Sequence, residues 1–317
     1  MFLKILVRTS PAITSRPVRV TLADGSNCDL SSLSPAALDQ LHWDQERAFA
    51  RQLKQTKAGS AERSDAFRLS YDTITAIHAC RRGAGDELAM GFNPRHALLV
   101  QRLLARARQR GVSRPRLFEI GYGAGHLLAE VSAAGYRAGG VDVSAHMQGI
   151  AAARLKDKDD ALLVGDFLRL DLRAWQDVDV VFSNDVLEHV HPDEAAQFVQ
   201  RAHALLAPGG VMVTITPNWH MRPSDVTRVH RGPRHDAEGL HLKEYTLRET
   251  TTMLRAAGFA TVATPLAVTR RRTILMRRGL CDAKRRLEPL LEYLPFGAAR
   301  LMCRGAGLST TLAWKRG

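Results

Sequence analysis

The sequence contains little cysteine and no long apolar run, and both absences limit what the chain can be. Its four cysteines (Cys28, Cys80, Cys281 and Cys303) lack the paired spacing of a disulfide framework or a zinc knuckle. No apolar run approaches the roughly 20 residues needed to span a bilayer. Lys4 interrupts the short apolar N-terminus, unlike the apolar core of a signal peptide. We therefore expect a globular protein of the reducing cytoplasm.

Acidic residues are scarce relative to basic ones at both ends of the chain. The net charge is +8 over residues 1–114 (18 basic, 10 acidic), −4 over 115–268 (15 and 19) and +9 over 269–317 (12 and 3). In the last segment the basic groups 270–272, 277–278 and 284–286 alternate with apolar residues. This pattern suits peripheral contact with a membrane, and equally a helix packed on the domain with its charges in solvent. Nucleic acid is a weaker expectation, because no RNA-binding module accompanies the basic residues.

A glycine-rich stretch, Arg-Leu-Phe-Glu-Ile-Gly-Tyr-Gly-Ala-Gly-His at residues 116–126, is the most informative motif present. It predicts a buried strand at 117–120, a loop with glycines at 121, 123 and 125, and then a helix. Glycines allow a ligand to approach the backbone closely, and the N-terminus of the helix favours an anionic group. A dinucleotide fingerprint would place glycine where His126 stands, so NAD and FAD are disfavoured.

Strands and helices alternate on both sides of this loop, which predicts an α/β doubly wound fold with a mostly parallel sheet. We expect an N-terminal, partly helical extension (1–91), a ligand-binding domain (92–268) and a basic C-terminal strand and helical extension (269–317). The expected helices are 34–57, 64–79, 94–110, 124–134, 145–155, 193–206 and 247–257, and a turn is expected at Asp24-Gly25. The expected strands are 117–120, 137–142, 161–164, 178–183 and 211–216, and two strand-like runs, 260–267 and 273–276, are expected to complete the sheet.

Three more features fall at the carboxyl ends of the expected strands, where such sheets bind ligands. Asp142 closes the second strand and can accept both hydroxyls of a ribose; its alternative role is a helix cap, for which Ser144 is better placed. Asp166 follows the third strand and can accept an adenine amino group, while Phe167 covers the ring. The run Asn-Asp-Val-Leu-Glu-His-Val at 184–190 ends the fourth strand.

Together these motifs resemble a class I S-adenosylmethionine-dependent methyltransferase. The 184–190 run, Leu-Leu-Ala-Pro-Gly-Gly at 205–210 and His-Leu-Lys-Glu-Tyr-Thr at 241–246 are similar to the branch that contains ubiquinone-biosynthesis O-methyltransferases. The resemblance covers roughly residues 92–268 and implies a Rossmann-like seven-stranded sheet that binds S-adenosylmethionine. The cofactor-binding residues that it implies are Glu119, Gly121, Tyr122, Gly123, Gly125, Asp142, Val143, Asp166, Phe167 and Asn184.

The chemistry at the acceptor has three candidate residues: Asp185, His189 and His241. Asp185, Glu188 and His189 are spaced to share one face of a helical turn, and they resemble the acidic-acidic-His pattern of metal-assisted O-methyltransferases. Either histidine can act as the base that removes the acceptor's proton. A divalent metal is an alternative that we do not favour, and we assign no metal ligand.

The sequence thus predicts an S-adenosylmethionine-dependent methyltransferase that methylates a hydroxyl of a small-molecule, lipid-linked or sugar acceptor. Two alternatives stay open. One is a metal-assisted RNA 2′-O-methyltransferase, suggested by Glu188, His189, His241 and the basic ends of the chain. The other is a non-catalytic binding protein that keeps the fold. The motifs do not specify the acceptor, or O- against N- or C-methylation.

Overall fold

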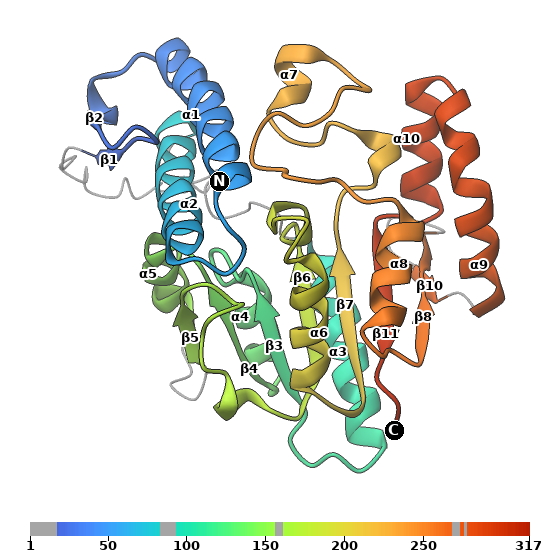
Figure 1. Ribbon diagram of the computed structural model, residues 1–317. Coiled ribbons are helices and arrows are strands. Elements are labelled where there is room, and N and C mark those ends of the chain that lie inside the picture. Colours follow the sequence, from blue (N-terminus) through green and yellow to red (C-terminus); the bar gives the residue numbers. More distant parts are fainter. Residues whose placement is uncertain (1–17, 83–92, 156–160, 268–272, 276–277) are drawn as a thin grey trace, which may run out of the picture.

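The computed structural model describes residues 18–82, 93–155, 161–267, 273–275 and 278–317 (Figure 1). Its centre is a seven-stranded sheet with the order β5-β4-β3-β6-β7-β11-β8. All neighbouring strands pair in parallel except β11, which is antiparallel to both β7 and β8. The strands are β3 (Arg116–Ile120), β4 (Arg137–Asp142), β5 (Ala161–Val164), β6 (Val178–Asn184), β7 (Leu206–Ile215), β8 (Thr261–Ala263) and β11 (Thr310–Trp314). The predicted doubly wound fold with a mostly parallel seven-stranded sheet is confirmed.

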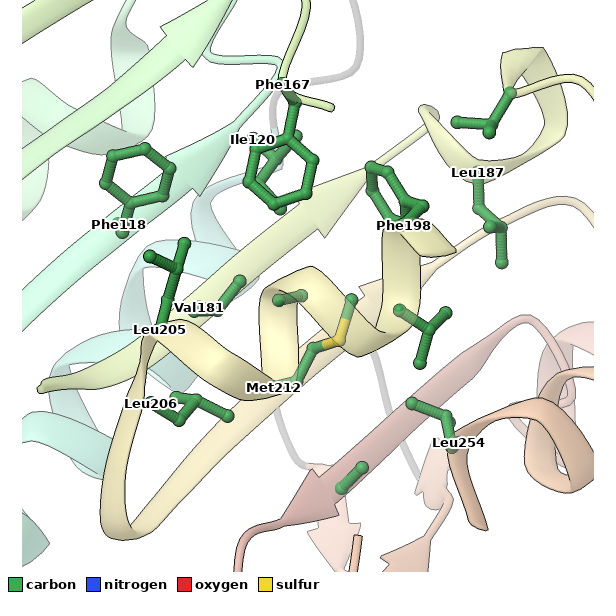
Figure 2. Close-up of a cluster of buried hydrophobic side chains, with 14 of the residues drawn as sticks. Phe118, Ile120, Phe167, Val181, Leu187, Phe198, Leu205, Leu206, Met212 and Leu254 are labelled. Carbon is green, nitrogen blue, oxygen red and sulfur yellow. The ribbon is translucent and has the colours of Figure 1, made fainter. Parts of the chain in front are cut away.

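Helices cover both faces of the sheet because successive strand residues point to opposite sides. On one face, Leu117 and Val180 pack with α3 (Pro94–Gln109), α4 (His126–Ala133) and α5 (Ala145–Arg154). On the other, Phe118 and Val181 pack with α6 (Ala195–Leu205) and α8 (Leu247–Ala256). Figure 2 shows the second cluster, in which Phe198 of α6 lies beneath the strands.

The N-terminal segment forms a helical pair, α1 (Pro35–Gln55) and α2 (Ala61–Arg82), preceded by a small hairpin of β1 (Arg19–Thr21) and β2 (Asn27–Asp29). Ser34 caps α1 by accepting a hydrogen bond from the Ala37 amide, and the turn expected at Asp24-Gly25 joins the two strands. The pair has its own apolar core, including Phe49, Leu53 and Ile77. In Figure 1 it lies across the carboxyl ends of β3, β4 and β5.

The prediction for the last strands of the sheet was correct for β8, which lies within the predicted run 260–267, and wrong for the run 273–276. The run 260–267 divides into β8 and β9 (Pro265–Ala267), and β9 pairs with β10 (Thr273–Leu275) in a separate two-stranded sheet. The seventh strand is instead β11, which enters between β7 and β8 from near the C-terminus. Within β7, Gly209 has a φ of 73° and the register against β6 shifts.

The C-terminal segment contains α9 (Arg278–Leu287), the 3-10 helix η6 (Glu288–Tyr293) and α10 (Phe296–Gly305) before β11. Residues on both sides of the predicted boundary at 268 therefore belong to one sheet, whereas the predicted boundary at 91 lies outside the described residues, as do the basic residues 270–272 and 277. Within the described part of the chain, no helix has the length and apolar content needed to cross a bilayer.

We predict that β11 is essential to the stability of the sheet. Leu312 is fully buried and pairs with Val213 on one side and Ala263 on the other. Leu312→Ala should lower the free energy of unfolding by about 2–5 kcal/mol, because it leaves a cavity in the core. Leu98→Ala on α3, where the side chain is 52% exposed, should change it by less than about 0.5 kcal/mol. Urea unfolding of the full chain measures both, and equal effects would contradict the assignment.

Candidate active site

A cavity of about 340 Å³ lies between the carboxyl ends of the strands and the N-terminal helical pair. It is lined by most of the site residues that the sequence predicts, but neither Gly125 nor His241 is among them. The predicted residues that line it are Glu119, Gly121, Tyr122, Gly123, Asp142, Val143, Asp166, Phe167, Asn184, Asp185 and His189.

The three glycines of the loop after β3 differ in what surrounds them. A Cβ on Gly121 would lie 2.5 Å from Cγ2 of Val186, and one on Gly125 would lie 2.8 Å from Cβ of Ala151. These two glycines therefore allow close packing of the loop on its neighbours. Gly123 has a φ of +50° and no atom within 4 Å of its Cβ position. Its backbone is the part of the loop that a ligand can approach directly.

Asp142 fixes the shape of this loop. One carboxylate oxygen accepts a hydrogen bond from the Gly123 amide (2.8 Å) and the other accepts one from the Ser144 amide (2.9 Å). Ser144 in turn caps α5, as predicted, through the Met147 amide. Burial raises the pKa of Asp142 to about 6, although both amide hydrogen bonds act in the opposite direction. Each oxygen keeps a lone pair for a ligand hydroxyl.

Glu119 brings a second buried carboxylate to the cavity wall. Its Oε2 atom has no hydrogen-bond partner among the described residues, and the side chain is only 6% exposed. Burial, followed by repulsion from Asp142, raises its pKa well above the usual value. An acceptor atom left alone inside a protein is costly unless a ligand supplies a donor.

Asp166 and Phe167, which follow β5, and Tyr122, which follows β3, are fixed in position by contacts with other side chains and the backbone. Asp166 accepts a hydrogen bond from the Ser64 hydroxyl of α2 (2.7 Å), and Phe167 packs edge-on against Phe198. The Tyr122 hydroxyl donates to the Leu163 carbonyl (3.0 Å), which directs that ring into the core. Asp166 and Phe167 thus border the cavity in a fixed position, while Tyr122 can meet a ligand chiefly through its backbone.

A cluster of ionisable side chains follows β6. Asp185 has a φ of +52°, an uncommon conformation for a residue with a side chain. Three residues nearby, Glu188, His189 and His241, present potential ligand atoms that lie within 4.8 Å of one another. Of the three side chains expected to share one face, Glu188 and His189 belong to this group, whereas its third member is His241 and not Asp185. The arrangement suits either proton transfer or a cation.

The two histidines of this cluster differ in charge and tautomer. Nδ1 of His189 lies 2.9 Å from the Leu240 carbonyl, which only accepts, so Nδ1 carries the hydrogen and Nε2 keeps its lone pair. Burial and the neighbouring His241 lower the pKa of His189 to about 3. For His241, burial favours the neutral form, but its hydrogen bond to Glu244 (2.8 Å) and the nearby Glu188 raise the pKa to about 9. His189 is the neutral member of the pair.

His241 lines a neighbouring cavity of about 490 Å³ together with Trp219 and Glu244. Leu242 borders both cavities, and the rings of His189 and His241 are 4.7 Å apart in an edge-to-face arrangement. The histidine pair therefore stands between the two cavities.

The N-terminal helical pair contributes residues to the cavity that the sequence did not predict. Glu46, Phe67 and Tyr71 line the cavity, and the Tyr71 ring lies 5.5 Å from that of His189. Burial raises the pKa of Glu46 to about 7, against the hydrogen bond that it accepts from the Leu240 amide (2.8 Å). The spacing of Ser64, Phe67 and Tyr71 does place them on one helical face, but an ordinary core-facing stripe has the same spacing.

Ion pairs attach this helical pair to the sheet. The Arg63 guanidinium, buried in α2, contacts Asp193 at 2.6 Å and Glu194 at 3.0 Å. The Glu194 carboxylate also accepts a hydrogen bond from the Gly59 amide (2.9 Å). The roof of the cavity is therefore fixed to the segment before α6 by a buried pair, Arg63 with Glu194, while Asp193 stays partly exposed.

Comparison with known proteins places this site in a family. A model of the methyltransferase domain matches residues 94–264, more than half of the chain. A probable S-adenosylmethionine-dependent methyltransferase of Mycolicibacterium smegmatis is 33% identical over 167 residues, which is 52% of this chain and 58% of that protein. A ubiquinone biosynthesis O-methyltransferase of Rhodopseudomonas palustris is 36% identical over 111 residues, 33% of this chain and 41% of that protein. The chain thus matches about half the length of these curated relatives.

Among solved structures, 1,6-didemethyltoxoflavin-N1-methyltransferase of Burkholderia thailandensis is 23% identical, with a TM-score of 0.46, and the match covers 83% of this chain and 93% of that one. The family match includes the glycine loop, Asp142 and the run after β6. The chain therefore belongs to the methyltransferase-domain family, and its predicted recognition as a class I S-adenosylmethionine-dependent methyltransferase is confirmed.

Proposed function

We propose that the protein transfers a methyl group from S-adenosylmethionine to a hydroxyl of a small, largely apolar acceptor. One observation carries this proposal: a single cavity combines the glycine loop and Asp142 with the lone pair of His189 and an apolar wall. The relative from Rhodopseudomonas palustris, a ubiquinone biosynthesis O-methyltransferase, supports it.

The cofactor fits the groups that the cavity offers. Asp142 has free lone pairs for the two ribose hydroxyls, and Asp166 with Phe167 borders the place of an adenine. The unpartnered Oε2 of Glu119 suits the amino group of the methionine portion, and Gly123 leaves room beside its backbone. We assign Val143 and Asn184, which also line the cavity, to the same cofactor. Gly125 supports the loop from outside the cavity.

When bound, the cofactor supplies an activated methyl group on a sulfonium. The cavity residues named above would hold it with this methyl group beside the acceptor oxygen, to which the methyl would be transferred while the electron pair stayed on sulfur. Nε2 of His189, whose tautomer the Leu240 carbonyl fixes, would take up the hydroxyl proton; because the pKa of His189 is about 3, it would do so once methylation has made the acceptor oxygen strongly acidic. His241, hydrogen bonded to Glu244, orients the His189 ring, and Asp185 borders the acceptor position.

The wall opposite the strands favours an apolar acceptor. It is made by side chains of the N-terminal helical pair and of the segment before α8, and a mostly hydrocarbon surface selects ligands by burial of apolar area. A phenol-like or lipid-linked hydroxyl fits this surface better than the ribose of an RNA. The residues of this wall are Leu53, Phe67, Ile74, Leu240 and Leu242.

A second candidate is metal-assisted O-methylation, and the convergence of Glu188, His189 and His241 favours it. Each histidine has its Nδ1 engaged, with the Leu240 carbonyl or with Glu244, so a cation would meet the free Nε2 of His189 and would displace the Nε2 proton of His241. Such second contacts are typical of metal-ligating histidines. A cation held by these three residues would lower the pKa of the acceptor hydroxyl.

We predict that Asp142→Ala weakens the binding of S-adenosylhomocysteine by about 10- to 100-fold, because hydrogen bonds to a charged group are lost. Asp171→Ala, which removes a carboxylate that is 58% exposed and paired with Arg173, should leave affinity unchanged. Calorimetric titration measures both, and thermal unfolding shows whether the variants are folded. Equal affinities for wild type and Asp142→Ala would refute the ribose assignment.

The same titration should depend on pH. Only the ionised Asp142 can accept both hydroxyls, and its pKa is about 6. Affinity should therefore be constant above this pKa and fall as the pH drops through it, by up to about tenfold per pH unit. Asp142→Asn should remove this dependence. A wild-type affinity that stays constant down to about pH 5 would contradict the carboxylate's role.

His189→Gln should lower kcat for methyl transfer to an aromatic hydroxyl acceptor by about 10²- to 10⁴-fold while leaving S-adenosylhomocysteine affinity unchanged. The control is His191→Gln, because His191 lines the same cavity but is paired with Asp193. Cofactor binding without turnover on any of a panel of phenols would instead support a non-catalytic binding protein.

Chelation separates the two candidate mechanisms. If His189 alone removes the proton, activity should survive exhaustive dialysis against a chelator and the purified protein should contain no stoichiometric metal. The cluster would instead be a cation site if chelation abolished activity, Mn²⁺ or Zn²⁺ restored it in the wild type, and neither ion restored it in Glu188→Gln.

A further inference from the structure

The C-terminal hairpin formed by α9, η6 and α10 carries a row of exposed apolar side chains. Leu287, Leu290 and Tyr293 follow one another at intervals of three and are 61%, 57% and 87% exposed. A 3-10 helix has three residues per turn, so such side chains lie in one line. Leu280, 46% exposed, precedes Leu287 by seven residues and shares its side of α9. The row therefore continues from α9 along η6.

Buried contacts on the opposite side of η6 fix the orientation of this row. Glu288 of η6 is only 2% exposed, and its carboxylate accepts hydrogen bonds from the Asn218 side chain (2.7 Å) and the Leu247 amide (2.6 Å). Leu291 is buried in an apolar cluster with Cys303 of α10. The hairpin cannot rotate its leucines inward without breaking these contacts.

α10 adds apolar surface to the same hairpin. Leu301 and Met302 are 73% and 52% exposed, whereas Ala299 and Cys303 on the inner side of the helix are fully buried. η6 packs against both α9 and α10, and Figure 1 shows the three elements at the edge of the molecule remote from the N-terminal helical pair. Exposed apolar area of this extent on a monomer marks an interaction surface.

The charge around this surface is positive and has no acidic counterpart. Arg286 and Arg304 are exposed, and among the described residues neither forms an ion pair. Burial lowers the pKa of Arg228, and the positive charges of Arg300 and Arg304 nearby lower it further. The nearby acid Asp282 is occupied by Arg255 and Arg285.

Glu292, the remaining acidic residue of the hairpin, also forms ion pairs within the protein. Its carboxylate contacts Arg222 at 2.7 Å, and His220 also pairs with it at 3.1 Å. The guanidinium groups of Arg286 and Arg304 are therefore available to an external anion, whereas the carboxylates of Asp282 and Glu292 are already paired.

We propose that this hairpin docks the protein on an anionic lipid bilayer. The leucine row would enter the boundary between headgroups and acyl chains, and the arginines would contact lipid phosphates. A nucleic acid would satisfy the arginines but leave the leucines in water. A second copy of the chain would bring the same positive charges together across a two-fold axis. The proposal goes beyond methyl transfer and does not depend on it.

Flotation of the full chain with vesicles tests the proposal. Binding should be saturable on phosphatidylcholine vesicles that contain phosphatidylglycerol, should weaken at high NaCl because salt screens the arginines, and should be negligible on phosphatidylcholine alone. Leu290→Glu should weaken binding by about tenfold or more, because burial of one leucine is worth at least that factor. Arg304→Glu should weaken it most at low salt.

The matched control is Leu98→Glu, which changes a leucine of similar exposure, 52%, on α3. It should bind vesicles as wild type does, and the affinity for S-adenosylhomocysteine should be unchanged in all three variants. Absence of vesicle binding, or binding that Leu290→Glu leaves intact, would overturn the proposal. So would light scattering that shows a dimer which Leu290→Glu dissociates, because the surface would then belong to a second copy.

Discussion

The carboxylate of Asp142 is the connection on which the rest of the site depends. Through two amide hydrogen bonds it joins the glycine loop after β3 to the start of α5. Ser144, which follows β4, extends the connection because its hydroxyl donates to Asp72 of α2 at 2.7 Å. One buried acid thus links the loop, the sheet and the N-terminal helical pair. A group that is already held by the protein on both oxygens can orient a ligand without reorganising.

The N-terminal helical pair determines what the site can accept besides a cofactor. The family model matches the chain from residue 94, so Leu53, Phe67 and Tyr71 lie outside the matched part, whereas Leu240 and Leu242 lie inside it. The proposed acceptor wall therefore combines the N-terminal helical pair with the matched domain. The buried pair of Arg63 with Glu194 keeps that wall in place, because separating it would leave a buried charge without a partner.

The sequence predicted correctly those strands whose own residue pattern is enough to identify them. Strands β3 to β6 are largely apolar runs that end at or just before a glycine or an acidic residue, and the glycine loop was assigned correctly. The position of β11 was not predictable in this way, because a strand of five residues gains its place only by pairing with β7 and β8, which are distant in sequence. The roles of Glu46 and Tyr71 were missed for a similar reason: helical spacing indicates a buried face but does not distinguish core from cavity.

The position of β11 in the sheet also limits how far the C-terminal hairpin can move. The chain leaves the sheet at β8, passes through α9, η6 and α10, and returns to the sheet between β7 and β8. Both ends of the hairpin are therefore anchored in the same core as the active site, unlike a flexible basic tail. If the hairpin docks on a bilayer as proposed, an apolar surface held this rigidly would meet it at one fixed angle, and that angle would set how the cavity faces the membrane. Removing the segment would take β11 with it, so only substitutions on its outer face can separate docking from folding.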